Sequence, residues 1–143
     1  MAGDIRLFVY GTLLAGERDH ALLDGAELVG PARTRATYTL VDLGVYPALL
    51  EGGTVSVVGE LYLVDKKQRF HVDVRKECPV LFQRITVELD DGSLAESYAM
   101  NDEQVRGKRR LTDGDWRKRF APRPRPHRGG PLVQAARARF KSK

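Results

Sequence analysis

The sequence predicts an α+β domain with a small curved or barrel-like sheet. Short runs rich in β-branched and aromatic residues recur along the chain, and the strongest lie at residues 5–9 and 54–64. Residues 80–89 and 94–100 give a second signal, because Asp91-Gly92 between them is a strong hairpin turn. Helical patterning is limited to a few short stretches, among them 102–105 and a marginal amphipathic pattern at Leu132, Ala136 and Phe140. Many short strands with few helices favour the α+β class.

The first predicted strand runs directly into a tight turn at Gly11. Residues 5–9 contain Ile, Leu, Phe and Val, which is typical of a buried strand. Gly11 permits backbone angles that other residues avoid, and its missing side chain lets a ligand approach the main chain. Consecutive N–H groups at such a turn can bind a carboxylate or an oxyanion. An ordinary β-turn at a strand end explains the same spacing, so both interpretations stay open.

Two further stretches carry helical signals. Residues 20–23 predict one or two helical turns that end near Gly25. Asp65 can cap a helix over residues 66–77, and Pro79 would end it. The apolar positions of this second helix are sparse, so its pattern is weak.

Length and composition are typical of one globular domain with a core and an added tail. The chain has 143 residues, of which 42% are hydrophobic. The single cysteine, Cys78, excludes an internal disulfide. His20, His71 and His127 have no metal-ligand spacing, so we expect neither a metal site nor a cofactor.

The sequence shows no membrane-targeting signal. No stretch approaches the roughly 18 to 20 apolar residues of a membrane span, so no membrane partner is expected. Residues 1–6 lack the apolar core of a signal peptide, and we therefore expect a cytoplasmic protein. The oligomeric state is not predicted.

Charge divides the chain into two parts. Residues 1–105 carry 10 Lys and Arg against 17 Asp and Glu, whereas residues 106–143 carry 14 against 2. We expect an acidic domain over 1–105 and a basic, Arg- and Pro-rich extension over 106–143. With Trp116 and Phe120 in it, the extension could contact the phosphates of a nucleic acid and stack on its bases. It could equally lie across the acidic body or stay solvated, and these two outcomes are the commoner ones for charge runs.

Four motifs occur in the order and spacing of a known family. The motifs are Val9–Leu13, Gly44–Leu49, Val58–Tyr62, and Asp73 with Pro79–Arg84. Any one motif is weak, whereas four in order indicate the fold. On these motifs the chain resembles the gamma-glutamylcyclotransferase-like proteins, which include the gamma-glutamylamine cyclotransferases, over about residues 5 to 100.

The resemblance implies a small mixed barrel with a cavity at its mouth. In the family, the main chain of the turn after the first strand holds the γ-glutamyl part of the substrate. Here that turn is Tyr10, Gly11, Thr12 and Leu13. A glutamate at the end of the later helix is the general base. The α-amino group attacks its own γ-carbonyl, which gives 5-oxoproline and releases an amine or amino acid. One carboxylate can accept and return the proton, and the intramolecular attack supplies much of the rate.

The chain departs from the family at the residue to which catalysis is assigned. Counting from Asp73 or back from Pro79, Lys76 holds the place of the glutamate and Glu77 follows it. One residue along a helix rotates a side chain by about 100° and moves it about 1.5 Å. Glu77 is therefore a displaced base only if the helix end is rewound, and otherwise a solvated charge. Lys76 could act as a base only after a large downward pKa shift caused by burial.

Three hypotheses remain open at this stage. The first is a gamma-glutamylcyclotransferase in which residues 10–13 hold the substrate and Glu77 is the catalytic base. The second is a small-molecule binding module of the same fold that lost its chemistry with the glutamate. The third is association with nucleic acid through residues 106–143. Glu60 is the other carboxylate that could face the cavity, although an outward Glu on a half-exposed strand is common.

Overall fold

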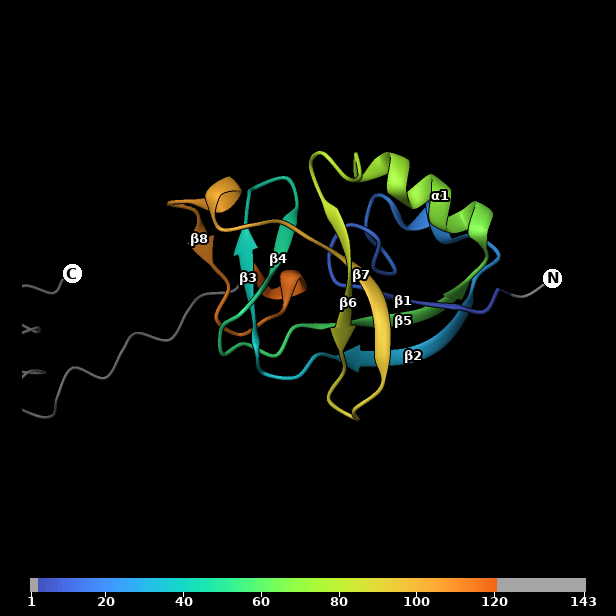
Figure 1. The fold of residues 1–143 in the computed structure, drawn as a ribbon, viewed down its shortest axis with the longest axis horizontal. Coiled ribbons are helices and arrows are strands. Elements are labelled where there is room, and N and C mark those ends of the chain that lie inside the picture. Colours follow the sequence, from blue (N-terminus) through green and yellow to red (C-terminus); the bar gives the residue numbers. More distant parts are fainter. Residues whose placement is uncertain (1–2, 121–143) are drawn as a thin grey trace, which may run out of the picture.

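The computed structural model describes residues 3–120, which form an eight-stranded sheet, one α-helix and three short 3-10 helices (Figure 1). The strands are β1 (Ile5–Val9), β2 (Glu27–Arg33), β3 (Tyr38–Asp42), β4 (Pro47–Glu51), β5 (Val58–Val64), β6 (Gln83–Glu88), β7 (Leu94–Ala99) and β8 (Arg109–Arg110). The helices are η1 (His20–Leu23), α1 (Lys66–Arg75), η2 (Glu103–Val105) and η3 (Trp116–Lys118).

The sheet is mixed and partly closed. Its strand order is β2-β5-β1-β7-β4-β3-β8, with β6 added alongside β7. β1 pairs antiparallel with β5 and parallel with β7. An antiparallel bridge from Thr34 to Leu89 joins the end of β2 to the end of β6, so the path β2-β5-β1-β7-β6 returns on itself. The expected α+β class and mixed, barrel-like sheet are confirmed.

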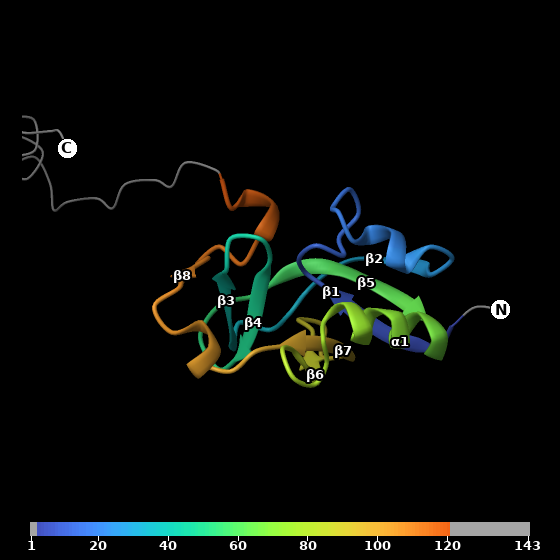
Figure 2. The same ribbon diagram turned by 90° about the horizontal axis from the view of Figure 1, so that it is seen from above.

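β1 lies in the interior of the sheet because its residues are apolar on both faces. Leu7, Phe8 and Val9 are all buried. Figures 1 and 2 both show α1 alongside β1. The helix contributes one buried residue, Val72, to the core, which agrees with its weak apolar pattern. The end of β1 and the end of α1 therefore lie on one firmly packed unit.

α1 begins as expected and ends earlier than expected. The Asp65 side chain accepts a hydrogen bond from the Gln68 N–H, and the Gln68 side chain accepts one from the Asp65 N–H, which makes a capping box. The sequence predicted that the helix would continue to residue 77, but its last residue is Arg75. Glu77 has a φ of 51°, in the left-handed region that ends helices.

The strand predicted over residues 54–64 is shorter in the structure. β5 begins at Val58, and Val55 instead makes an isolated bridge to Tyr38. Gly59 is a site of close approach, because a Cβ there would lie 2.0 Å from the Val9 carbonyl oxygen.

The predicted division at residue 105 does not match the packing. β8 pairs with β3, although its two residues were assigned to the basic extension. Leu111 and Trp116 are each 1% exposed and belong to the same core as Val105. Residues 106–119 are therefore part of the folded unit despite their basic composition. The Arg- and Pro-rich stretch from residue 121 onward lies outside the described residues.

Candidate active site

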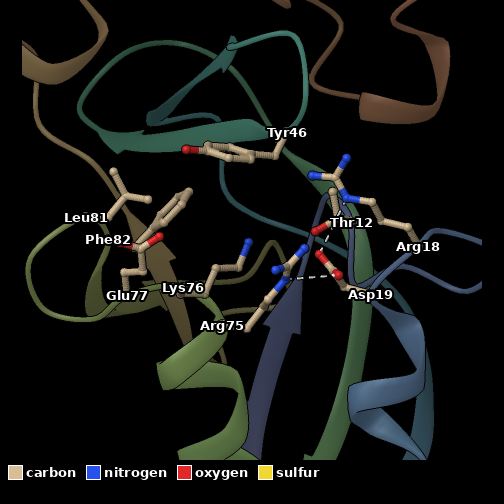
Figure 3. Close-up of a pocket in the computed structure, with 9 residues that line it drawn as sticks. All are labelled: Thr12, Arg18, Asp19, Tyr46, Arg75, Lys76, Glu77, Leu81 and Phe82. Atoms are coloured by element: carbon tan, nitrogen blue, oxygen red, sulfur yellow. Dashed lines mark hydrogen bonds and ion pairs between the residues drawn. The ribbon is translucent and has the colours of Figure 1, made fainter.

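A small pocket opens where the turn after β1, the loop before η1, the segment before β4 and the chain after α1 meet (Figure 3). Its volume is about 110 Å³. Tyr46 lies across one side, and its ring centre is 5.6 Å from that of Phe82. The pocket is small, with two aromatic rings among mostly polar and charged side chains.

Lys76 is the side chain that enters the pocket. Figure 3 shows its amine pointing into the space between Tyr46, Thr12 and Arg75. The residue is 6% exposed, and Nζ lies 4.6 Å from the centre of the Phe82 ring. Within residues 3–120, no carboxylate makes an ion pair with this amine. An amine with these surroundings is poorly hydrated, and Asp19 acts on its proton only through a longer-range charge interaction.

Burial lowers the pKa of Lys76 from 10.5 to about 8. The negative charge of Asp19 raises the pKa of Lys76, whereas the positive charges of Arg75 and Arg18 lower it further. A change of this size corresponds to about 3 kcal/mol. The Phe82 ring favours the ammonium by about 1 kcal/mol, so burial outweighs it. About one tenth of the protein then carries a neutral Lys76 at pH 7.

The end of α1 sets the direction of the Lys76 side chain. The Lys76 N–H donates to the Val72 carbonyl, and the left-handed Glu77 then turns the chain out of the helix. The Leu81 N–H donates to the Glu77 carbonyl and the Phe82 N–H to the Lys76 carbonyl. This loop folds back on itself, which brings the Phe82 ring against the lysine.

Glu77, the predicted base, stands at the rim of the pocket. It is exposed, and within residues 3–120 its side chain makes no hydrogen bond or ion pair. The helix end is rewound, which was the condition for Glu77 to reach the cavity. The same rewinding directs Lys76 inward, so the catalytic role of Glu77 stays a prediction.

Among the four turn residues predicted to hold substrate, only Thr12 lines the pocket. The Tyr10 side chain lies in the core, where its hydroxyl donates to the Tyr98 carbonyl at 2.7 Å and accepts from the Leu49 N–H at 3.1 Å. Burial raises the pKa of Tyr10 well above its ordinary value. The Tyr10 side chain ties the end of β1 to β7 and β4.

The main chain of the turn is better placed than its side chains. Gly11 is packed against Pro47, since a Cβ would lie 2.5 Å from the proline ring, and the Leu13 side chain is buried. The Leu14 N–H donates to the Gly11 carbonyl, which leaves Thr12 and Leu13 at the centre of the turn. Within residues 3–120 the N–H groups of Thr12 and Leu13 make no hydrogen bond. Of these two residues, Thr12 lines the pocket.

Arg18 and Asp19 complete the site, and sequence reasoning missed both. Asp19 Oδ1 lies 3.1 Å from Arg75 Nε, and Oδ2 lies 3.8 Å from Arg18 Nε. The Asp19 side chain is 13% exposed, while the two arginine side chains are about half exposed at the mouth. With Lys76, three basic groups lie around the Asp19 carboxylate, and Glu77 lies at the rim. The sequence signal that could have identified Arg18 and Asp19 is their position in the loop directly after the glycine turn.

Glu60 faces the loop before η1 instead of the pocket. It accepts hydrogen bonds from the Ala15 N–H at 3.0 Å, the Tyr62 hydroxyl at 3.0 Å and Arg117 at 3.1 Å. Burial acts to raise the pKa of Glu60, but the bonds from Ala15 and Arg117 outweigh it, and the pKa is lowered. Glu60 therefore has a structural role in holding this loop.

A match to a known protein family over most of the chain shows which family it belongs to. Comparison with known protein families matches residues 7–118 to the family described as Gamma-glutamyl cyclotransferase, AIG2-like. The chain belongs to this family. The match extends past residue 105, in agreement with the packing of residues 106–118 in this cyclotransferase fold.

Two relatives of this cyclotransferase chain differ in how much of their length it covers. A Vibrio cholerae protein, whose name assigns it provisionally to the gamma-glutamylcyclotransferases, is 41% identical over 113 residues, which are 79% of this chain and 96% of that protein. The Bos taurus gamma-glutamylaminecyclotransferase is 40% identical over 87 residues, which are 54% of this chain and 52% of the bovine protein. The chain thus spans about half the length of the bovine relative.

Solved structures show the same fold. The crystal structure of an AIG2-like protein from Mus musculus superposes with a TM-score of 0.68 at 25% identity, and covers 88% of this chain and 99% of the mouse chain. A uropathogenic E. coli-specific protein gives a TM-score of 0.69 at 27% identity, with 80% and 93% covered.

The cyclotransferase motif residues Asp73 and Arg84 support the loop that carries Lys76. Asp73 accepts a hydrogen bond from the Tyr98 hydroxyl and pairs with Arg84, which also lies 3.6 Å from Glu96. The Asp73 carbonyl accepts the N–H of Cys78 at 2.9 Å. Both ends of the loop are therefore fixed to the sheet.

Residues 3–120 show neither a metal cluster nor a membrane helix. In this part of the chain no three or more His, Cys, Asp and Glu side chains gather in a way that could hold a metal ion. None of its helices has the length and apolar character that a membrane crossing requires.

Proposed function

We propose that this protein is a gamma-glutamyl cyclotransferase in which Lys76 replaces the glutamate as the proton acceptor. The observation that carries the proposal is the buried amine of Lys76 inside the pocket, beside the turn at Thr12. The substrate is a small γ-glutamyl compound, in keeping with the family and with a pocket of about 110 Å³.

The chemistry requires one group to move a proton. As the substrate α-amino nitrogen attacks the γ-carbonyl carbon, it must lose a proton, which the neutral Lys76 amine accepts. The resulting ammonium then returns the proton to the leaving nitrogen, which departs as an amine or amino acid. The products are that amine and 5-oxoproline. The free N–H groups of Thr12 and Leu13 would stabilise the negative charge that develops on the carbonyl oxygen.

Release of 5-oxoproline from a panel of γ-glutamyl amines and dipeptides tests this function. Lys76→Met should lower the rate by about a hundredfold or more, because general base catalysis contributes at least that much. Lys67→Met is the matched control, since Lys67 is an exposed lysine of α1, the helix that directly precedes Lys76. Glu77→Gln decides the earlier prediction that Glu77 is the base. Loss of activity in Glu77→Gln with a normal Lys76→Met would assign the proton transfer to Glu77.

A binding module without turnover is the second candidate. The excess of basic groups, with Arg18, Arg75 and Lys76 around Asp19, favours a ligand that carries a carboxylate. This candidate predicts that 5-oxoproline or a γ-glutamyl amide raises the melting temperature while no panel member is consumed. It also predicts that Lys76→Glu gains activity.

Location and the basic segment give two subsidiary proposals. We propose a cytoplasmic location, which cell fractionation would test. Nucleic-acid association is best tested by removing residues 121–143, because an earlier cut would remove Trp116 from the core. Salt-sensitive binding that persists in the chain ending at Phe120 would exclude residues 121–143 as its cause.

A further inference from the structure

We propose that the pocket captures small 2-oxo acids covalently, with the Lys76 amine forming a reversible Schiff base. This activity is separate from the cyclotransferase reaction and does not depend on it. It follows from three features of the pocket: the Lys76 amine, the basic groups at the mouth and the small volume.

The surroundings of Lys76 are those of a nucleophilic lysine. A lysine becomes a nucleophile when it is desolvated against apolar groups or placed beside other cations. Lys76 meets both conditions, because the Phe82 ring lies under its amine and the Arg75 and Arg18 charges lie nearby. The opposing group is Asp19, whose oxygens face the two guanidinium groups. The amine therefore has an available lone pair at accessible pH.

The two arginines at the mouth are placed to bind the carboxylate of the ligand. Arg18 and Arg75 each use Nε toward Asp19, and their side chains are 49% and 53% exposed. A guanidinium has five N–H donors, so both retain donors for a second anion. A carboxylate held there would leave an adjacent ketone carbon directed at the Lys76 amine. A 2-oxo acid places these two groups on neighbouring carbons.

The enclosed volume limits the ligand to a small acid. About 110 Å³ between Tyr46 and Phe82 suits an acid of a few carbons. Tyr46, Leu81 and Phe82 supply apolar surface, and the rest of the lining is polar or charged. The apolar surface suits the carbon chain of the acid, and the charged groups suit its carboxylate.

The step balances without an added oxidant or reductant. The Lys76 nitrogen forms a bond to the ketone carbon, and the carbonyl electron pair moves to oxygen, which is protonated. The carbinolamine then loses this hydroxyl with a proton as water, leaving a C=N bond. Water reverses the reaction.

Borohydride trapping tests the proposal on the full-length protein. The protein is incubated with pyruvate, reduced with sodium borohydride and digested, and the modified lysine is located by mass spectrometry. Modification should map to Lys76 at least about tenfold ahead of Lys66 and Lys67, which are exposed on α1. Lactate, which has the carboxylate but no ketone, should compete, and acetone, which has no carboxylate, should label Lys76 far less.

Two variants complete the test. Lys76→Arg keeps the positive charge and should abolish the specific adduct, whereas Lys67→Arg should leave it unchanged. Modification spread evenly over the exposed lysines of the wild-type protein would overturn the proposal, and that result requires no variant to fold. A Lys76 adduct in a protein that releases no 5-oxoproline would support this inference while the proposed cyclotransferase function fails.

Discussion

The amine of Lys76 lies 4.6 Å from the centre of the Phe82 ring, and the lysine side chain lines the pocket. The contact exists because the chain leaves α1 at Glu77 and folds back, so that the Phe82 N–H reaches the Lys76 carbonyl. The proposed chemistry depends on how readily this amine loses its proton.

Replacing Lys76 by methionine should stabilise the protein at pH 7. The folded pKa of about 8 lies below the ordinary 10.5, so at pH 7 the folded state holds an unfavourable charge. That penalty of about 3 kcal/mol, less about 1 kcal/mol for the Phe82 contact, predicts a gain of about 2 kcal/mol. Urea unfolding of both proteins measures the difference.

The Lys76→Met substitution should also change how the stability of the protein depends on pH. Between pH 8 and 10.5 the unfolded wild-type chain binds more protons than the folded one, so its stability rises with pH. The Lys76→Met protein lacks this rise, so the difference in free energy of unfolding between the two proteins should decrease over this pH range. A difference that stays constant from pH 7 to 10 would show that Lys76 is not destabilised by its charge.

Arg117 should hold the loop that carries Arg18 and Asp19. It donates to the Ala15 carbonyl at 2.6 Å and to Glu60 at 3.1 Å. Arg117→Ala should lower the free energy of unfolding by about 1 kcal/mol and speed hydrogen exchange at the Ala15 amide. Lys118→Ala, at an exposed neighbouring position, is the control. Unchanged exchange at Ala15 would contradict this role.

The folded unit should end near residue 120. A chain cut after Phe120 keeps Leu111 and Trp116 and should unfold at nearly the temperature of the full-length protein. A chain cut after Lys108 loses both buried side chains and β8, so it should lose cooperative unfolding, since deleting one buried large side chain already costs about 3–5 kcal/mol. Calorimetry compares the three. Cooperative unfolding of the chain cut after Lys108 would restore the predicted boundary at residue 105.

Local signals predicted much of the fold. The capping box at Asp65, the hairpin turn at Asp91-Gly92 and the apolar run of β1 each depend on a few neighbouring residues. The segment 106–119 could not be placed in this way, because β8 pairs with β3, far away in sequence. The basic composition of this segment reflects its exposed side chains and does not indicate that Leu111 and Trp116 are buried.

The site was harder to predict because it depends on one helix end. The backbone conformation at Glu77 decides whether Lys76 or Glu77 enters the pocket. The periodicity of apolar residues in the sequence carries no information on that conformation. The pKa of Lys76 then depends on Phe82, Arg18 and Asp19, which reach it from other segments. Of the turn residues 10–13, Thr12 lines the pocket, and the role of the turn in holding substrate stays a prediction.

The pH dependence of 5-oxoproline release tests the central claim most directly. If neutral Lys76 is the base, kcat/KM of the wild-type protein should rise with pH and level off above about 8. In Lys76→Glu the acidic limb should move to the carboxyl range, near pH 4 to 5. A wild-type limb already complete by about pH 5 would contradict the account, because a carboxylate would then be the base.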